Sequence, residues 1–361
     1  MGRIAISVAI TTYKRPRMVE DLILSYQAQS LAESELLIVD DCVEDMETGA
    51  MVSRYQEKDP RIRFIKNKDN LGYSKNFLKS LLESRGEYIV TLGDDDILLH
   101  EDALKKYVDV FDRNPNVGFV YSNILQFNGA YEMDYAYTHF EKSRVFGSLE
   151  DSLRGIWLRS CYIPGIGLRN SVDFASLYPK QDLLFPQVEL IGKLLATSEA
   201  FGIGEFLIGG RAHDDQLGFE AVKGRRIKNN ERHAAVELLE IFETLRLYYR
   251  DLGITFRLEN DFVKKFFAKS HATILPTEKI NTGNMNLLRV FFSAIRKNRN
   301  ILLDLNYLFY MAISLLLPKR VLLSLKDRYK RYLVSKKWSG ENAYFDTRVR
   351  RIGLISQHTR K

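Results

Sequence analysis

The N-terminal third of the chain alternates between two hydrophobic patterns. Apolar residues recur at every second position in residues 4–10, as on the buried face of a strand, and at helical spacing in residues 18–26. Later segments repeat the two patterns, with strands expected over 36–39, 62–64, 88–92 and 118–125 and helices over 74–84 and 101–113. Strand and helix repeat about every 25 to 30 residues, which predicts an α/β fold with a mostly parallel sheet flanked by helices.

Polar residues directly follow three of these predicted strands. Thr11-Thr12-Tyr13 follows the first strand, Asp40-Asp41 the second and Asp94-Asp95-Asp96 the fourth. In mostly parallel sheets, ligands bind beyond the carboxyl ends of the strands. The coincidence predicts a binding site at that edge of the sheet.

The three consecutive aspartates suggest a metal site. Adjacent carboxylates repel one another unless a cation or a hydrogen-bond network offsets their charge. Mg²⁺ and Mn²⁺ favour oxygen ligands, which they usually share with phosphate oxygens. A solvated acidic turn would show the same three letters, so this motif alone leaves both readings open.

A second segment is suited to a phosphate group or to the edge of a base. Asn70-Leu71-Gly72 reads as a turn, and Lys75 places a cation one helical turn further on. An ordinary helix start would look the same.

Residues 127–210 are less regular and rich in Tyr, Gly and Pro, and we expect them to face an acceptor.

The C-terminal part is predicted to be helical and basic. From about residue 229 the apolar spacing becomes helical, and we expect two domains, residues 1–220 and 221–361. Residues 301–317 are apolar but shorter than the roughly 20 residues of a membrane-spanning helix. Residues 318–361 hold 13 Lys and Arg against 3 Asp and Glu, whereas the whole chain has a net charge of +7. Such a tail favours an anionic partner, either a membrane surface or a nucleic acid.

The cysteines and the N-terminus favour a cytoplasmic location. Cys42 and Cys161 are the only two cysteines, too few for a disulfide framework, which indicates a reducing compartment. Residues 1–10 lack the long apolar run and cleavage site of a signal peptide. With the basic tail, a peripheral position on the inner face of the cell membrane is compatible with this reading.

Four segments together resemble the inverting family 2 glycosyltransferases with the GT-A (Rossmann-like) fold. They are residues 7–16, 37–41, 69–76 and 86–96, and their order and spacing agree with the family. The resemblance is strong over residues 4–123 and weaker to about residue 217. It implies a nucleotide-sugar site formed by Thr11, Tyr13, Asp41, Asn70, Gly72, Lys75, Asp94 and Arg211. It also implies metal ligands at Asp95, Asp96 and His213.

The sequence departs from the family pattern at two places. Gly93 stands where the usual Asp-x-Asp motif has its first aspartate, so Asp95 matches the second one. The Glu-Asp pair that supplies the family's catalytic base is absent 80 to 100 residues later. The nearest acid is Glu189, at a predicted helix start, and we expect it to be the base, with Asp182 as the next candidate.

The resemblance implies an enzyme that depends on Mn²⁺ or Mg²⁺. It would transfer a sugar from a UDP-, GDP- or dTDP-sugar to a glycan or a lipid-linked acceptor, in the synthesis of a surface polysaccharide such as O-antigen or capsule.

Three alternatives stay open: a nucleotidyltransferase that makes nucleotide sugars, a non-catalytic sugar-binding protein and a nucleic-acid-binding protein. The first would carry a glycine-rich basic loop after the first strand, where Thr12-Tyr13-Lys14-Arg15-Pro16 stands instead. No RNA- or DNA-binding motif is found, so no nucleic acid is expected as a partner.

Overall fold

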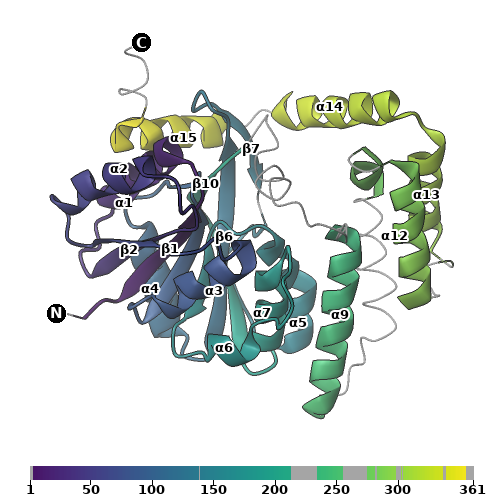
Figure 1. The fold of residues 1–361 in the computed structure, drawn as a ribbon, viewed down its shortest axis with the longest axis horizontal. Coiled ribbons are helices and arrows are strands. Elements are labelled where there is room, and N and C mark those ends of the chain that lie inside the picture. Colours follow the sequence, from purple (N-terminus) through teal and green to yellow (C-terminus); the bar gives the residue numbers. More distant parts are fainter. Residues whose placement is uncertain are drawn as a thin grey trace. The chain divides into compact units, whose positions relative to one another are not determined.

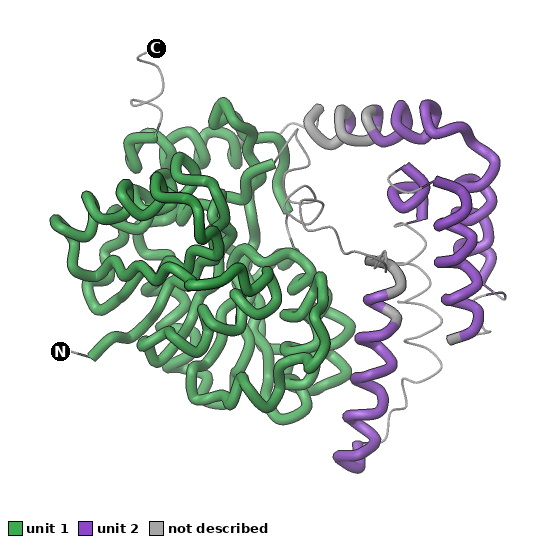
Figure 2. The backbone as a smooth tube through the Cα atoms, in the orientation of Figure 1, with its two compact units in different colours: residues 1–224, 337–361 green, residues 225–336 purple. Residues whose placement is uncertain are grey.

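A computed structural model of the protein describes residues 3–137, 139–212, 234–254, 275–280, 283–297, 302, 304–335 and 339–354. The chain forms two compact units (Figure 2). Unit 1 comprises residues 1–224 and 337–361, and unit 2 comprises residues 225–336. We expected residues 221–361 to form one C-terminal region, whereas residues 337–361 group with the N-terminal unit.

Unit 1 is built on a ten-stranded sheet (Figure 1). Its main path has the order β3-β2-β1-β4-β9-β6-β10-β5, while β7 pairs with β6 and β8 with β10. The strands are β1 (Ile6–Thr12), β2 (Ser34–Asp40), β3 (Ile62–Lys66), β4 (Tyr88–Gly93), β5 (Ile97–Leu98), β6 (Val117–Phe127), β7 (Met133–Tyr137), β8 (Arg144–Phe146), β9 (Ile166–Arg169) and β10 (Glu199–Arg211). β3, β2, β1 and β4 are mutually parallel, and so are β6 and β10.

Helices flank this sheet. They are α1 (Pro16–Gln27), α2 (Glu47–Gln56), α3 (Tyr73–Leu82), α4 (Ala103–Arg113), α5 (Leu149–Gly155), the 3-10 helix η1 (Trp157–Cys161), α6 (Phe174–Leu177), α7 (Pro186–Leu194) and α15 (Ser339–Ile352). α1 and α7 each begin with a proline, which suits a first helical turn because the nitrogen there needs no hydrogen-bond partner. Val19, Leu22 and Tyr26 form the buried stripe of α1, at the spacing that predicted this helix.

The structure confirms the α/β fold with a central sheet and flanking helices. The sheet is mixed, because β5, β7, β8 and β9 pair antiparallel with their neighbours. The five predicted strands are β1, β2, β3, β4 and β6. The less regular residues 127–210 also add strands to the sheet, among them β9, which runs antiparallel between β4 and β6. β9 has only four residues, too few for a period-two pattern to stand out. Gly167 fits there because a Cβ would lie 2.9 Å from the Tyr107 ring.

Unit 2 is helical in the residues that the structure describes. Its longer helices are α9 (Ala234–Asp251), α12 (Asn284–Lys297), α13 (Leu305–Leu316) and α14 (Lys319–Ser335). Leu287, Val290, Tyr307 and Met311 belong to a core cluster shared by α12 and α13. Asp304 caps α13, because its carboxylate accepts a hydrogen bond from the Tyr307 N–H (2.8 Å). None of the described helices is both long and apolar enough to cross a bilayer.

Candidate functional site

The candidate site lies where the parallel strands of unit 1 end. Thr12 at the end of β1 pairs with Asp40 of β2, and Thr11 pairs with Gly93 of β4. β10 runs in the same direction, since β9 is antiparallel to both β4 and β6, and it ends at Arg211. The strand ends that carry the predicted residues therefore meet at one edge of the sheet.

Asp94 and Asp96, directly after β4, are buried and held by protein groups. The Asp94 carboxylate accepts hydrogen bonds from the Thr12 hydroxyl (2.8 Å) and from Arg15 Nη1 (2.9 Å). Asp96 turns back toward the strand end, where its Oδ2 accepts a hydrogen bond from the Gly93 N–H (2.6 Å). A Cβ on residue 93 would lie 2.6 Å from an Asp95 oxygen and 2.7 Å from an Asp96 oxygen. Glycine at position 93 therefore leaves room for these two carboxylates.

Asp95 is the most accessible of the three aspartates. Its side chain is 15% exposed, against 8% for Asp94, and Arg15 Nη1 lies 3.3 Å from its Oδ2. Its backbone carbonyl accepts a hydrogen bond from Arg211 Nε (3.2 Å). The loop is thus fixed from two sides, and Asp95 is the carboxylate that an approaching ion would meet.

The electrostatics of this loop show an excess of negative charge. Burial, together with the neighbouring charge of Asp95, raises the pKa of Asp94 from 3.8 to about 6. The same two causes raise the pKa of Asp96 well above its usual range. Arg15 and Thr12 favour the charged form of Asp94 but do not offset burial.

This donor set fits a divalent cation. Carboxylate oxygens are the ligands that Mg²⁺ and Mn²⁺ prefer, and the raised pKa values mean that added positive charge would favour the ionised loop. Asp95 offers the accessible oxygen, whereas one Asp96 oxygen already accepts the Gly93 N–H. The other predicted ligand, His213, lies outside the described residues.

Asp41 shapes the predicted turn at residues 70–72. Its carboxylate accepts hydrogen bonds from the backbone N–H groups of Leu71 (2.7 Å) and Gly72 (2.8 Å) and from the Asn67 amide (2.9 Å). Gly72 has a φ of +95°, a conformation that residues other than glycine rarely adopt. The structure therefore joins Asp41 and Gly72, residues that the sequence placed in separate motifs.

Four further predicted nucleotide-binding residues are at least partly accessible near these strand ends. Tyr13 is 38% exposed in the loop after β1, and Thr11 is half-buried at the end of that strand. Lys75 is exposed on the first turn of α3, beyond the turn that Asp41 holds. Asn70 is exposed within that turn. These side chains are accessible to a ligand at the strand ends.

Glu189 lies in the first turn of α7 and is buried. Its carboxylate forms an ion pair with Lys193 (Nζ–Oε1 2.6 Å) on the next turn of the helix. The same helix start contacts the start of α3, because the Tyr73 hydroxyl donates to the Gln187 side chain (3.3 Å). The other candidate base, Asp182, is exposed before α7. Glu189 is thus paired in this structure, and its role as base stays a prediction.

Sequence reasoning missed the residues that hold the acidic loop in place. Thr12 and Arg15 stand inside the segment that resembles the family, which is a signal that could have found them. Asp21 gave no signal: it lies on α1 and forms a buried ion pair with Arg211 (2.6 Å). We predicted that Arg211 contacts the nucleotide; its side chain contacts Asp21, the Asp95 carbonyl and two aromatic rings.

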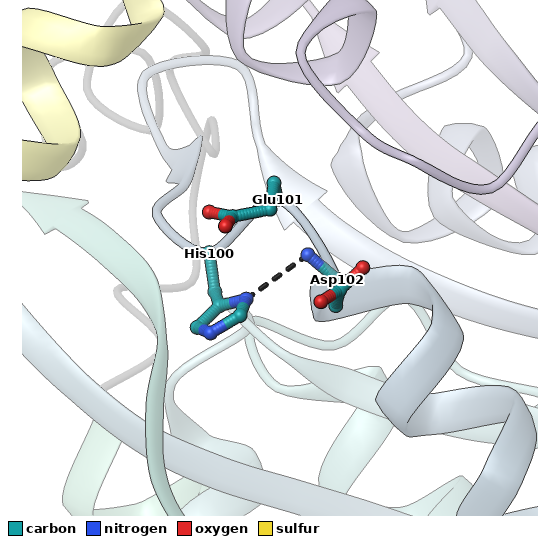
Figure 3. Close-up of side chains that lie close together, drawn as sticks. All are labelled: His100, Glu101 and Asp102. Carbon is teal, nitrogen blue, oxygen red and sulfur yellow. Dashed lines mark hydrogen bonds between the residues drawn. The ribbon is translucent and has the colours of Figure 1, made fainter.

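A second acidic cluster lies nearby in sequence, at His100, Glu101 and Asp102 (Figure 3). Its ligand atoms lie within 4.8 Å of one another, yet protein groups already use them. His100 Nδ1 accepts the Asp102 N–H (3.0 Å), and Asp102 accepts the Ser30 hydroxyl (2.5 Å). Glu101 forms ion pairs with two arginines of α15. These partners favour a docking point for α15 over a metal site.

The part of the chain that forms this candidate site is similar to known proteins. The sequence model of glycosyl transferase family 2 matches residues 7–174, which include the acidic loop and the Asp41 turn. A Campylobacter jejuni GalNAc(5)-diNAcBac-PP-undecaprenol beta-1,3-glucosyltransferase is 33% identical over 95 residues, 26% of this chain and 30% of that protein. The alignments with two other curated relatives cover only 13% and 42% of those proteins' own lengths.

Solved structures show the same architecture. Staphylococcus aureus TarS 1–349 superposes with a TM-score of 0.51 at 16% identity, covering 82% of this chain and 90% of that one. A Pyrobaculum calidifontis mannosyltransferase, solved with GDP-Man and Mn²⁺, has a TM-score of 0.50 at 14% identity, covering 91% and 88%. The fold of this chain is thus of the GT-A type. Residues 7–174 match the family 2 glycosyltransferase model.

The raised pKa of Asp94 predicts a pH-dependent stability in metal-free protein. The folded state binds this proton more tightly than the unfolded state, so stability falls as the pH rises from about 4 to 6 and stays lower above that. We expect Asp94→Asn to gain in free energy of unfolding relative to wild type across this window, measured by urea unfolding with EDTA. The Asp109→Asn variant, at an exposed carboxylate of α4, is the matched control. If the free energies of unfolding of wild type and Asp94→Asn changed with pH in the same way, the raised pKa of Asp94 would be contradicted.

Proposed function

We propose that this protein transfers a sugar, with inversion at the anomeric carbon, from a nucleotide-diphosphate sugar to a glycan or lipid-linked acceptor. One observation carries the proposal: an accessible Asp95 stands in a negatively charged loop at the strand ends of a family 2 domain. Solved proteins of the same fold were captured with UDP-GlcNAc and with GDP-Man and Mn²⁺, which supports a nucleotide-sugar donor. The relative named for an undecaprenol-linked substrate supports a lipid-linked acceptor, and a relative named for teichuronic acid biosynthesis supports a role in polysaccharide synthesis.

The donor would bind along the edge formed by β1, β2 and β4. Thr11, Tyr13 and the turn held by Asp41 would contact the base and ribose, since they surround the ends of the first two strands. Asn70, Gly72 and Lys75 would contact the nucleotide from the start of α3, where Lys75 brings an accessible positive charge. Asp94, in the acidic loop, would act through Arg15, which also contacts Asp95. Arg211, at the end of β10, would keep Asp95 in place through its backbone carbonyl.

A divalent cation, Mn²⁺ or Mg²⁺, would be held by Asp95, with Asp96 and His213 as further candidate ligands. Bound there, the ion would supply Lewis-acid stabilisation of the negative charge on the leaving diphosphate. Arg15 offsets part of the carboxylate charge, because it contacts both Asp94 and Asp95.

Glu189 would take the proton of the attacking acceptor hydroxyl as general base. The hydroxyl oxygen forms a bond to the anomeric carbon while the bond to the diphosphate oxygen breaks on the opposite side, which inverts the configuration. Lys193 would stabilise the ionised carboxylate before the reaction, since the two side chains lie 2.6 Å apart. The helix N-terminus also favours the negative charge of Glu189.

Unit 2 has a surface suited to an anionic membrane. Leu305, Phe309 and Leu316 lie on one face of α13 and are 83%, 58% and 80% exposed, while Tyr307 and Met311 face the core. Exposed basic residues follow on α14, namely Lys319, Arg320, Lys326 and Arg328. An apolar face beside basic side chains favours an interfacial contact with anionic lipid. Such a contact would bring the enzyme to a lipid-linked acceptor.

Replacement of Asp95 tests the metal-assisted reaction. We expect Asp95→Ala to lower the metal-dependent release of nucleoside diphosphate from the donor by about 100-fold or more, because charge stabilisation in the transition state is lost. Release is measured with UDP-GlcNAc and GDP-mannose, with and without Mn²⁺. Asp109→Ala, which removes an exposed carboxylate of α4, should keep wild-type turnover. Equal turnover of Asp95→Ala and wild type would refute the site.

Replacement of Glu189 tests the general base. Glu189→Gln keeps the shape of the side chain, so donor affinity should be unchanged while turnover falls by roughly 100-fold or more. Asp182→Asn is the informative companion, because Asp182 is the other candidate and is exposed. Full activity in Glu189→Gln with loss in Asp182→Asn would transfer the role to Asp182.

The membrane contact can be tested by sedimentation with vesicles. Full-length protein should bind vesicles that contain phosphatidylglycerol more strongly than pure phosphatidylcholine vesicles. A variant with serine at positions 305, 309 and 316 should lose this binding, whereas Met285→Ser, at an exposed site on α12, should retain it. Equal sedimentation of wild type and the triple variant, or none by wild type, would refute the contact.

A further inference from the structure

The C-terminal helix α15 belongs to the core that supports the acidic loop. Phe345 and Val349 of α15 are fully buried in a cluster with Ile97, Leu99 and Phe127. Ile97 follows the three aspartates directly, and Phe127 ends β6. A segment that follows unit 2 in the sequence therefore completes the packing behind the proposed metal site.

Polar contacts fix the same helix to unit 1. Arg348 and Arg351 both form ion pairs with Glu101, the latter at 2.6 Å. The Tyr344 hydroxyl donates to the Phe206 carbonyl of β10 (2.9 Å). Glu101 lies three residues after the end of β5, which itself follows the three aspartates. These contacts therefore hold α15 against the segment between β5 and α4.

A continuous series of contacts joins Phe345 to Asp95. The rings of Phe345 and Phe127 have their centroids 5.4 Å apart. The Arg211 guanidinium lies over the Phe127 ring, 4.8 Å from its centroid, and over the Tyr131 ring at 5.1 Å. Arg211 Nε then donates to the Asp95 carbonyl (3.2 Å).

The far side of Arg211 is also fixed. Its Nη2 pairs with Asp21 at 2.6 Å, and the Tyr131 hydroxyl donates to the same Asp21 oxygen (2.5 Å). Arg211 thus has one ion-pair partner and two ring contacts, and Phe345 packs against one of these two rings, that of Phe127.

We propose that α15 is a positioning element of the active site, in which Phe345 sets the place of Arg211 and thereby of Asp95. The metal part of this inference rests on the proposed function. Phe345 touches neither donor nor metal in this account, so it is a positioning residue and not a catalytic one. A local effect on residues 93–99 distinguishes this role from a general contribution to stability.

The test compares four variants of the full-length protein. Phe345→Ala removes the ring, Phe345→Leu keeps most of its bulk, and Arg348→Ala combined with Arg351→Ala removes the ion pairs with Glu101. Arg350→Ala, at an exposed arginine of the same helix, is the control. Amide hydrogen exchange is followed at residues 93–99 and, as a remote reference, at residues 34–40 of β2.

We expect Phe345→Ala to raise exchange at residues 93–99 while β2 keeps wild-type protection. Binding of Mn²⁺ alone, measured by the EPR signal of the free ion, should weaken by about 10- to 100-fold, as for other residues that orient metal ligands. Phe345→Leu should restore most of both properties, and the double arginine variant should show a smaller change in the same direction.

Two outcomes would overturn the inference. One is unchanged exchange at residues 93–99 in both Phe345→Ala and the double arginine variant. The other is an equal rise at β2, which would show a global loss of stability in place of a local one. A wild-type protein that does not bind Mn²⁺ would contradict the proposed metal site, and the exchange data would still decide the role of α15.

Discussion

The arrangement of unit 1 depends on the negative charge of three adjacent carboxylates at the end of β4. Burial makes this charge costly, as the raised pKa values of Asp94 and Asp96 show. The surrounding groups offset part of the cost: Thr12 and Arg15 bind Asp94, and the Gly93 N–H binds Asp96. Carboxyl groups with strongly perturbed pKa values are typical of functional sites, and the proposed cation would offset the charge of this loop.

The central strands and the location of the site could be predicted from the sequence, because both depend on local patterns. β1, β2 and β4 are apolar runs that end in polar residues, and parallel pairing brings those ends together. The partners of the acidic loop could not be predicted. The ion pair of Asp21 and Arg211 joins residues 190 positions apart, and neither side chain has a local signal that identifies the other.

Hydrophobic periodicity also does not show how the C-terminal helices are divided between the two units. Helical spacing continues through the C-terminal third, yet α15 returns to unit 1 while α12, α13 and α14 belong to unit 2. The basic residues of this third are used differently as a result. Arg348 and Arg351 pair with Glu101, whereas Lys319 and Arg320 are exposed at the start of α14. Net charge over a segment cannot separate these two uses.

The proposed function requires a metal-dependent nucleotide-sugar site at Asp95. A thermal-shift experiment tests this site most directly. Wild type and Asp95→Ala are heated with UDP-, GDP- and dTDP-sugars, each with and without Mn²⁺. A ligand that binds only the folded state raises the unfolding midpoint. We predict a rise with one nucleotide class that requires Mn²⁺ and is lost in Asp95→Ala. An unchanged midpoint with every donor, or the same rise in Asp95→Ala, would contradict the account.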